Sequence, residues 1–274
     1  MTAGRPLARI LIVAGSDSGG GAGIQADIKT VTALGGFAAT AVTALTAQNT
    51  KGVFGVFEVP AAFVRQQMDV VLEDIGADAV KTGMLGNPEV IETIARALDR
   101  NAMGVPLVVD PVMVAKGGHR LLDPAAHQAL VACLFPRAAV LTPNLPEAEA
   151  LTGMAVTDVE AMIAAGRALL AMGPKAVLVK GGHLPGDALV DVLVGPFGVE
   201  TFEGTRLDSR HTHGTGCTLA SAIAVGLAQG LSLSRAVARA RDYVRKAIRL
   251  APGLGGGHGP LNHGHTVRSF SGEQ

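Results

Sequence analysis

The sequence predicts an α/β protein with a central, mostly parallel β-sheet. Two observations predict this class: short apolar runs of strand length recur along the 274 residues, and helical patterns separate them almost throughout. A strand that is apolar along its whole length fits a parallel sheet whose two faces are covered by helices. No Ser/Pro-rich linker and no long repeat divides the chain, so we expect one domain over residues 1–274, with frayed ends at 1–6 and 266–274.

The elements follow one another in a regular order. The first part predicts a buried strand, a glycine-rich loop, a helix, two strands and a helix, at Ile10–Val13, 15–23, Ile24–Leu34, Ala38–Ala44, Val53–Val59 and Ala61–Leu72. The middle predicts strands at Ala79–Lys81, Leu107–Val109, Val140–Leu141 and Val177–Lys180, with helices near 88–98, 124–134 and 159–172. A hairpin of Leu189–Val194 and Val199–Phe202 precedes two closing helices. In the first of these, apolar residues recur at helical spacing from Ala220 to Leu227, which indicates a buried helix face.

Composition narrows the classes of partner. Lys plus Arg and Asp plus Glu both number 23, so the net charge is zero, and neither nucleic acid nor a membrane surface is indicated as a partner. Glycine is abundant, at 36 residues, which suits loops that approach ligands closely. Two cysteines provide no disulfide framework, and the opening apolar run is too short for a signal peptide or a membrane span. We therefore expect a cytoplasmic protein.

Polar or glycine-rich segments follow the predicted strands. In open α/β sheets, ligands bind beyond the carboxyl ends of the strands, so these segments should converge on one edge. They are residues 15–23, Gln48–Asn49, Lys81–Leu85, Asp110–Met113, Thr142–Glu147 and Lys180–His183.

The first glycine-rich loop, residues 15–23, fits neither common nucleotide motif. No lysine follows its glycines, as a P-loop requires, and Ile24 stands where a dinucleotide fingerprint counted from Gly19 needs its last glycine. The loop is either a flexible turn or a ligand loop. Asp27, just inside the following helix, is either a charge that the helix dipole favours or a ligand for a polar substrate.

Asn144 and Glu147 stand three residues apart at a strand-to-helix junction. This spacing is typical of a capping box, but the amide and the carboxylate are also suited to hold Mg²⁺ beside phosphates, usually through water. Lys180 ends a strand before two glycines, so its ammonium either points to the same edge or is solvated. Three irregularly spaced histidines indicate a loose tail rather than a metal site: His258, His263 and His265.

Residues 214–217, Gly-Thr-Gly-Cys, stand where the first closing helix begins. Backbone N–H groups at a helix start lack partners within the helix, and the dipole is positive there, so this turn predicts an anion site. The same field predicts a lowered pKa for the Cys217 thiol. A metal-ligand role is not indicated, because no second cysteine stands at ligand spacing, and a buried, inert cysteine is the alternative.

Taken together, the motifs resemble the ribokinase superfamily, and within it the hydroxymethylpyrimidine/phosphomethylpyrimidine kinases of thiamine biosynthesis. The resemblance extends in order over nearly the whole chain, through Ala14–Thr30, Thr43–Thr50, Lys81–Leu85, Asp110–Met113, His213–Thr218 and Gly259–His263. Sugar kinases of the superfamily generally carry Asp as the base where this sequence has Cys217. The pyrimidine kinases and a related group of pyridoxal kinases carry Cys there, so the difference narrows the branch.

The resemblance implies a three-layer α/β/α sandwich and an ATP-dependent kinase that phosphorylates an alcohol and then its monophosphate. It implies a substrate pocket of Gly15, Ala22, Asp27, Gln48, Met84 and Val112. It implies an ATP–Mg²⁺ site of Asp110, Asn144, Glu147 and Lys180, with Mg²⁺ held by Asp110 and Glu147 through water. It implies an anion hole of Gly214, Thr215, Gly216 and Cys217, with the Cys217 thiol as general base. We expect small-molecule substrates and a homodimer.

Three alternatives remain open at this stage. A pyridoxal kinase would keep ATP, Mg²⁺ and the cysteine. A cysteine hydrolase would need a histidine base, for which His211 and His213 are near in sequence. A catalytically inactive vitamin-binding regulator is disfavoured by the intact Asn144, Glu147 and anion-hole residues.

Overall fold

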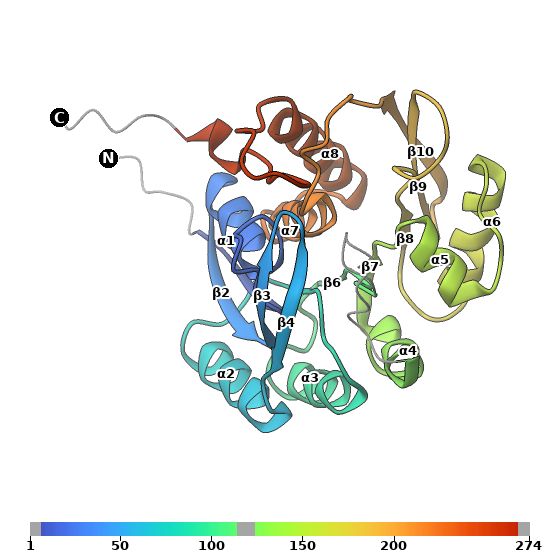
Figure 1. Ribbon diagram of the computed structural model, residues 1–274. Helices are drawn as coiled ribbons and strands as arrows, with labels where there is room; N and C mark the ends of the chain where they lie inside the picture. The colour runs from blue at the N-terminus through green and yellow to red at the C-terminus, as the bar shows by residue number, and fades with distance from the viewer. Residues whose placement is uncertain (1–6, 114–123, 268–274) are drawn as a thin grey trace, which may run out of the picture.

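The computed structural model describes residues 7–113 and 124–267 (Figure 1). Its main feature is an eight-stranded sheet in the order β10-β9-β8-β7-β6-β5-β1-β2. The strands are β1 (Ala8–Ala14), β2 (Gly36–Val42), β5 (Ala79–Thr82), β6 (Leu107–Val109), β7 (Ala138–Leu141), β8 (Val177–Val179), β9 (Ala188–Gly195) and β10 (Gly198–Thr205). All neighbours from β2 to β8 pair in parallel, and only β9 runs antiparallel to both of its neighbours. The predicted mostly parallel sheet is confirmed.

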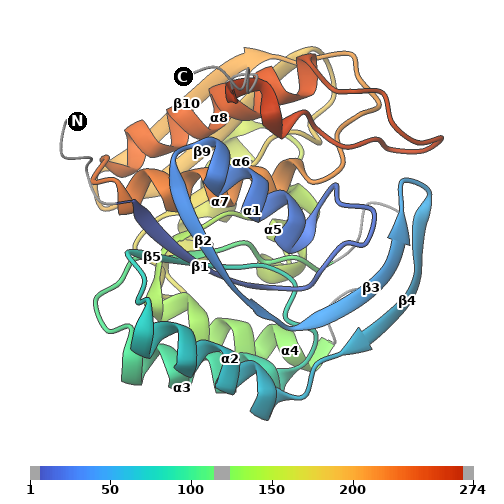
Figure 2. The same ribbon diagram turned by 90° about the vertical axis from the view of Figure 1, so that its left-hand side faces the viewer.

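Helices cover both faces of this sheet (Figure 2). One face is covered by α1 (Gly23–Ala33), α7 (Thr215–Ala228) and α8 (Leu233–Arg249). The other is covered by α2 (Ala61–Asp74), α3 (Pro88–Asn101), α4 (Pro124–Ala129), α5 (Leu145–Thr152) and α6 (Val159–Leu170). Successive side chains of β1 point to opposite faces of the sheet: Ile10 and Ile12 pack on the first face, and Leu11 and Val13 pack on the second. The three-layer α/β/α sandwich is therefore confirmed.

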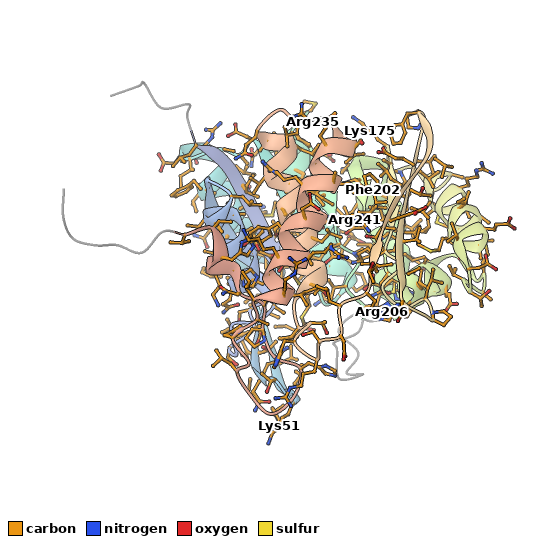
Figure 3. All side chains as sticks on the ribbon, turned by 90° about the horizontal axis from the view of Figure 1, so that it is seen from above. Lys51, Lys175, Phe202, Arg206, Arg235 and Arg241 are labelled. Atoms are coloured by element: carbon orange, nitrogen blue, oxygen red, sulfur yellow. The ribbon has the colours of Figure 1, made fainter. Side chains whose placement is uncertain are left out.

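The sequence of α7 explains its central place. It carries no charged residue, and every side chain from Thr218 to Val225 is buried. The helix α8 packs on it closely: a Cβ on Gly226 would lie 2.6 Å from the Cβ of Ala236. The other side of α8 is basic, and its Arg241 guanidinium lies 5.6 Å from the ring centre of Phe202 on β10 (Figure 3). Within residues 7–113 and 124–267, no helix is long and apolar enough to cross a membrane.

A separate two-stranded hairpin projects from the sheet, made of β3 (Ala44–Asn49) and β4 (Gly52–Glu58). The sequence predicted one strand over Ala38–Ala44 and no strand for residues 45–49, and this was wrong. The chain leaves the sheet after Val42, where the Thr43 N–H still donates to the Ala14 carbonyl at 3.0 Å. From Ala44 onward it pairs with β4 instead.

The segment after α8 is ordered, although a loose tail was expected. A short 3₁₀ turn, His263–Thr266, packs against α1 and α8, and the Thr266 hydroxyl donates to the Ala33 carbonyl at 2.8 Å. His263 is buried, with Nε2 3.0 Å from the Thr218 hydroxyl. Expected fraying from residue 266 is thus corrected for Thr266 and for Val267, whose N–H donates to the Gly264 carbonyl at 3.0 Å. The remaining expected frayed residues, 1–6 and 268–274, lie outside the described residues.

Candidate active site

A cavity of about 520 Å³ opens at the carboxyl ends of β1, β5, β6, β7 and β8. Strand β3 contributes Thr46 and Gln48 to its wall, and the start of α7 contributes the turn from Gly214 to Cys217. The expected convergence of the strand ends is present. The predicted site residues in the wall are Gly15, Ala22, Gln48, Met84, Val112, Asp110, Asn144, Glu147, Lys180, Gly214, Thr215, Gly216 and Cys217.

The end of the cavity near the hairpin combines apolar walls with one side-chain amide. A Cβ on Gly15 would lie 3.1 Å from the Met84 sulfur, so a glycine lets the strand end approach that wall. The Gln48 amide stands beside two side chains: its Oε1 accepts from the Thr46 hydroxyl at 3.2 Å, and its Nε2 lies 3.4 Å from His213 Nε2. A planar ligand with a polar edge fits this combination.

Asp17 and His213 are site residues that the sequence analysis missed. The Asp17 carboxylate accepts the backbone N–H groups of Gly19, Gly21 and Ala22 at 2.8 to 3.0 Å, which fixes the glycine-rich loop. His213 Nε2 lies 2.8 Å from the same carboxylate. Burial opposes ionisation of Asp17, but His213 and these N–H groups outweigh it and lower its pKa. An Asp followed by glycines is itself a turn signal, whereas a contact with His213 across 196 residues leaves no local signal.

Asp27 does not line the cavity, which corrects its expected contact with substrate. Its carboxylate is fully buried between the Lys81 ammonium, 2.8 Å away, and the Ser221 hydroxyl, 2.7 Å away. Burial raises the pKa of Asp27 and acts to lower the pKa of the Lys81 ammonium, but Asp27 and its negative neighbours outweigh burial at Lys81 and raise that pKa, so Lys81 stays charged beside Asp27. Asp27 therefore joins α1, β5 and α7 behind the cavity wall.

The opposite end of the cavity gathers charged side chains. The Lys180 ammonium lies 3.0 Å from Asp110 Oδ1, and Asp110 also accepts from the Thr142 hydroxyl at 3.2 Å. Asn144 and Glu147 form the capping box, with the Asn144 side chain accepting from the Glu147 N–H at 2.9 Å and Glu147 accepting from the Asn144 N–H at 2.7 Å. Both also face the cavity, so the capping role and a ligand role are compatible.

The electrostatics of this end favour a cation. Burial, reinforced by the negative charge of Asp110, raises the pKa of Glu147 to about 7, although Lys180 acts against the rise. Within residues 7–113 and 124–267, no group of three or more His, Cys, Asp or Glu side chains is placed to hold a metal ion. Asp110 and Glu147 thus fit Mg²⁺ only as two carboxylates that share the ion with water and nucleotide phosphates.

The turn at the start of α7 has the geometry of an anion site. Gly214 precedes the helix with φ of 81°, and no side chain caps the helix start. A Cβ on Gly214 would lie 1.9 Å from the Gly21 carbonyl oxygen, so the close contact with the glycine-rich loop requires glycine. A Cβ on Gly216 would lie 3.3 Å from the Lys180 ammonium. The Thr215 N–H makes only a long hydrogen bond, 3.5 Å, to the Thr212 carbonyl, so backbone N–H groups without a side-chain cap and a cation meet at this turn.

The Cys217 thiol does not have the lowered pKa predicted from its place at a helix start. Burial raises its pKa to about 11; Lys81 acts in the opposite direction, and Asp27 and Asp110 add to the rise. In the described parts of the chain, neither His211 nor His213 forms a hydrogen bond to this thiol, and His213 is engaged by Asp17 instead. The thiol–imidazole pair of a cysteine hydrolase is therefore not formed.

Comparison with known proteins places this geometry in a family. A sequence model of the phosphomethylpyrimidine kinase family matches residues 17–262. The hydroxymethylpyrimidine/phosphomethylpyrimidine kinase of Streptomyces coelicolor is 52% identical over 94% of this chain and 95% of its own length. The thiamine biosynthesis bifunctional protein ThiED of Geobacter sulfurreducens is 54% identical, and the chain spans about half of it, 52%.

Solved structures show the same architecture. The pyridoxal kinase from Staphylococcus aureus in complex with AMP-PCP and pyridoxal superposes with a TM-score of 0.88 at 33% identity, covering 96% of both chains. That protein differs from the relatives above in the substrate that its name gives, so kinases named for two different substrates share this fold. The family match over most of the chain is decisive: this chain belongs to the phosphomethylpyrimidine kinase family.

Proposed function

We propose that the protein uses ATP to phosphorylate 4-amino-5-hydroxymethyl-2-methylpyrimidine to its monophosphate and then to the diphosphate, in the pyrimidine branch of thiamine diphosphate biosynthesis. The observation that carries the proposal is one cavity with two chemically different ends. The Gln48 amide and the apolar side chains of Met84 and Val112 suit an aminopyrimidine. Asp110, Asn144, Glu147 and Lys180 suit a magnesium nucleotide.

The anion turn lies between these two ends. In the first transfer, the hydroxymethyl oxygen attacks the γ-phosphorus of ATP, a new P–O bond forms, and the bond to the bridging oxygen of ADP breaks. The N–H groups at Gly214, Thr215 and Gly216 and the Lys180 ammonium stabilise the charge on the moving phosphoryl group. The hydroxyl proton passes to the Cys217 sulfur when the thiol is ionised. In the second transfer, a phosphate oxygen of the monophosphate takes the place of the hydroxyl.

Asp110 and Glu147 would hold the Mg²⁺ of the nucleotide, largely through water. When bound, the ion would neutralise charge on the ATP phosphates. The chain itself supplies and orients the two carboxylates: the capping box fixes Glu147, while the Thr142 hydroxyl and the Lys180 ammonium fix Asp110.

Pyridoxal phosphorylation is the second candidate, favoured by the close superposition with pyridoxal kinases. The test is steady-state ADP release with the hydroxymethylpyrimidine, its phosphate and pyridoxal as acceptors. We expect the highest kcat/KM with one of the pyrimidines. The variant Cys217→Ser controls for ADP produced by other enzymes in the preparation. A higher kcat/KM for pyridoxal than for either pyrimidine would replace the proposal by a pyridoxal kinase.

We also propose a homodimer located in the cytoplasm. The hairpin β3–β4 supports a dimer, because it exposes four large apolar side chains that no described segment covers: Leu45 at 50%, Phe54 at 71%, Val56 at 39% and Phe57 at 68%. Light scattering should give a dimer for the wild type and a monomer for Phe54→Ser/Phe57→Ser.

The two free thiols, Cys133 and Cys217, support the cytoplasmic location, because free thiols suit a reducing compartment.

A further inference from the structure

Residues 255–260, Gly-Gly-Gly-His-Gly-Pro, run between two parts of the active site that are far apart in sequence. We call this segment the strap. Figure 2 shows it in red beside the tip of the β3–β4 hairpin, and Figure 3 shows Lys51 at the outer end of that tip. The hairpin carries Gln48. On its opposite side the strap contacts residues 210–213, which lead directly into the anion turn at Gly214.

One side of the strap binds the hairpin tip through Thr50. The His258 N–H donates to the Thr50 carbonyl at 2.9 Å, and the Gly257 N–H donates to the Thr50 hydroxyl at 3.2 Å. Since the tip joins β3 to β4, these bonds fix the end of a hairpin that is otherwise outside the main sheet.

The other side of the strap binds the segment before α7. The His213 N–H donates to the Gly259 carbonyl at 3.2 Å, and His213 pairs with Pro260 as an isolated parallel bridge. His258 Nδ1 lies 3.3 Å from the Arg210 carbonyl. Two adjacent residues, His258 and Gly259, therefore connect the hairpin to the approach of the anion turn.

The glycines of the strap alternate in how closely they are packed. A Cβ added to Gly255 would lie 2.4 Å from the Thr50 side chain. One added to Gly257 would lie 2.0 Å from the Thr50 carbonyl oxygen, and one added to Gly259 would lie 2.1 Å from His211 Nδ1. Contacts under 3 Å to backbone require the chain to move. Gly256 lies between them and would place its Cβ 3.3 Å from the flexible end of Lys51. Residues 255–258 form a bend, and Gly255 has a φ of 81°, so three of the four strap glycines are held by close contacts while Gly256 is not.

We propose that the strap sets the separation between the acceptor pocket and the anion turn, with Thr50 and Gly257 as positioning residues. The inference rests on the proposed function for its kinetic consequence, because the acceptor must bind to Gln48 while its hydroxyl reaches the phosphoryl group at Gly214–Cys217. The physical coupling itself is a property of the chain without ligands.

The decisive comparison is Gly257→Ala against its neighbour Gly256→Ala. Gly257→Ala should raise the KM for the hydroxymethylpyrimidine by about 10- to 100-fold, since small displacements of positioned groups carry losses of that size. Its ATP dissociation constant should stay near the wild-type value, because the nucleotide end is built from β6, β7 and β8. Gly256→Ala should behave as the wild type.

Amide hydrogen exchange on the protein without ligands gives a readout that does not depend on activity. Gly257→Ala should speed exchange in both the hairpin and residues 211–216, and Gly256→Ala in neither. Thr50→Val, which removes the hydroxyl acceptor, should have a weaker effect in the same direction, and Thr50→Ser should restore wild-type behaviour. These two variants keep the test open if Gly257→Ala does not fold.

Two results would overturn the proposal. One is wild-type exchange and acceptor KM in both Gly257→Ala and Thr50→Val. The other is an equal loss of acceptor and ATP binding with a lowered melting temperature, which would make the strap a stabilising segment only. If the wild type does not phosphorylate the pyrimidine at all, the proposed function fails, while the exchange data still decide whether the strap couples the two parts.

Discussion

Replacing Asp27 by Asn tests whether this carboxylate belongs to a buried ion pair or to the substrate pocket. Asp27 and Lys81 are both fully buried and 2.8 Å apart. Removing one partner of such a pair leaves an uncompensated buried charge, which costs about 3–5 kcal/mol of unfolding free energy. For a protein of this size, that loss lowers the melting temperature by roughly 5–20 °C.

The assay is thermal and urea unfolding of Asp27→Asn beside a matched surface variant. Asp78→Asn provides the match, because Asp78 pairs with Arg9 at 2.7 Å but with side chains 35% and 45% exposed. An exposed pair of this kind contributes about 1 kcal/mol or less, so Asp78→Asn should unfold almost as the wild type does. Wild-type stability in Asp27→Asn, together with a raised acceptor KM, would refute the buried-pair assignment and return Asp27 to the pocket.

Three further predictions concern the cavity wall. Gln48→Ala should weaken pyrimidine binding by about 1–3 kcal/mol, the typical cost of an unpaired polar edge, and leave ATP binding unchanged in calorimetry; equal losses for both ligands would reject the pocket assignment. Glu147→Gln keeps a capping side chain but loses the carboxylate, so activity should require more Mg²⁺; an unchanged Mg²⁺ titration would leave Glu147 with its capping role alone. Because the pKa of Cys217 is raised to about 11, a thiolate base becomes more available as pH rises. Turnover should therefore increase from about pH 7 to 9 and fall by roughly 10²–10⁴-fold in Cys217→Ser, and full activity in Cys217→Ala would exclude a chemical role for the thiol.

Local patterns in the sequence were enough to predict the parallel sheet with helices on both faces and the convergence of the strand-end segments on one edge. Apolar strands such as β1 and β6 read correctly because both faces are buried, and the residues that follow parallel strands must meet at one edge. The Asn144–Glu147 spacing predicted a capping box because both of its hydrogen bonds join residues that are close in sequence.

What the sequence could not predict depends on distant partners. The family resemblance implied that Asp27 contacts substrate, and its ion-pair partner Lys81, on β5, is not visible from the pattern of the helix that carries Asp27. The pKa of Cys217 was expected to fall with the helix dipole, whereas burial by the surrounding elements dominates it. The strap glycines read as a loose tail because their close contacts are with Thr50 and His211, which lie far away in sequence.

The most direct test of the central claim is a phosphorus NMR time course of the protein with Mg-ATP and the hydroxymethylpyrimidine. We predict that a phosphate monoester resonance appears first, as ADP forms, and is then replaced by the paired resonances of a diphosphate ester. Conversion of ATP to ADP and free phosphate without either ester, or ester formation only when pyridoxal is supplied, would contradict the account.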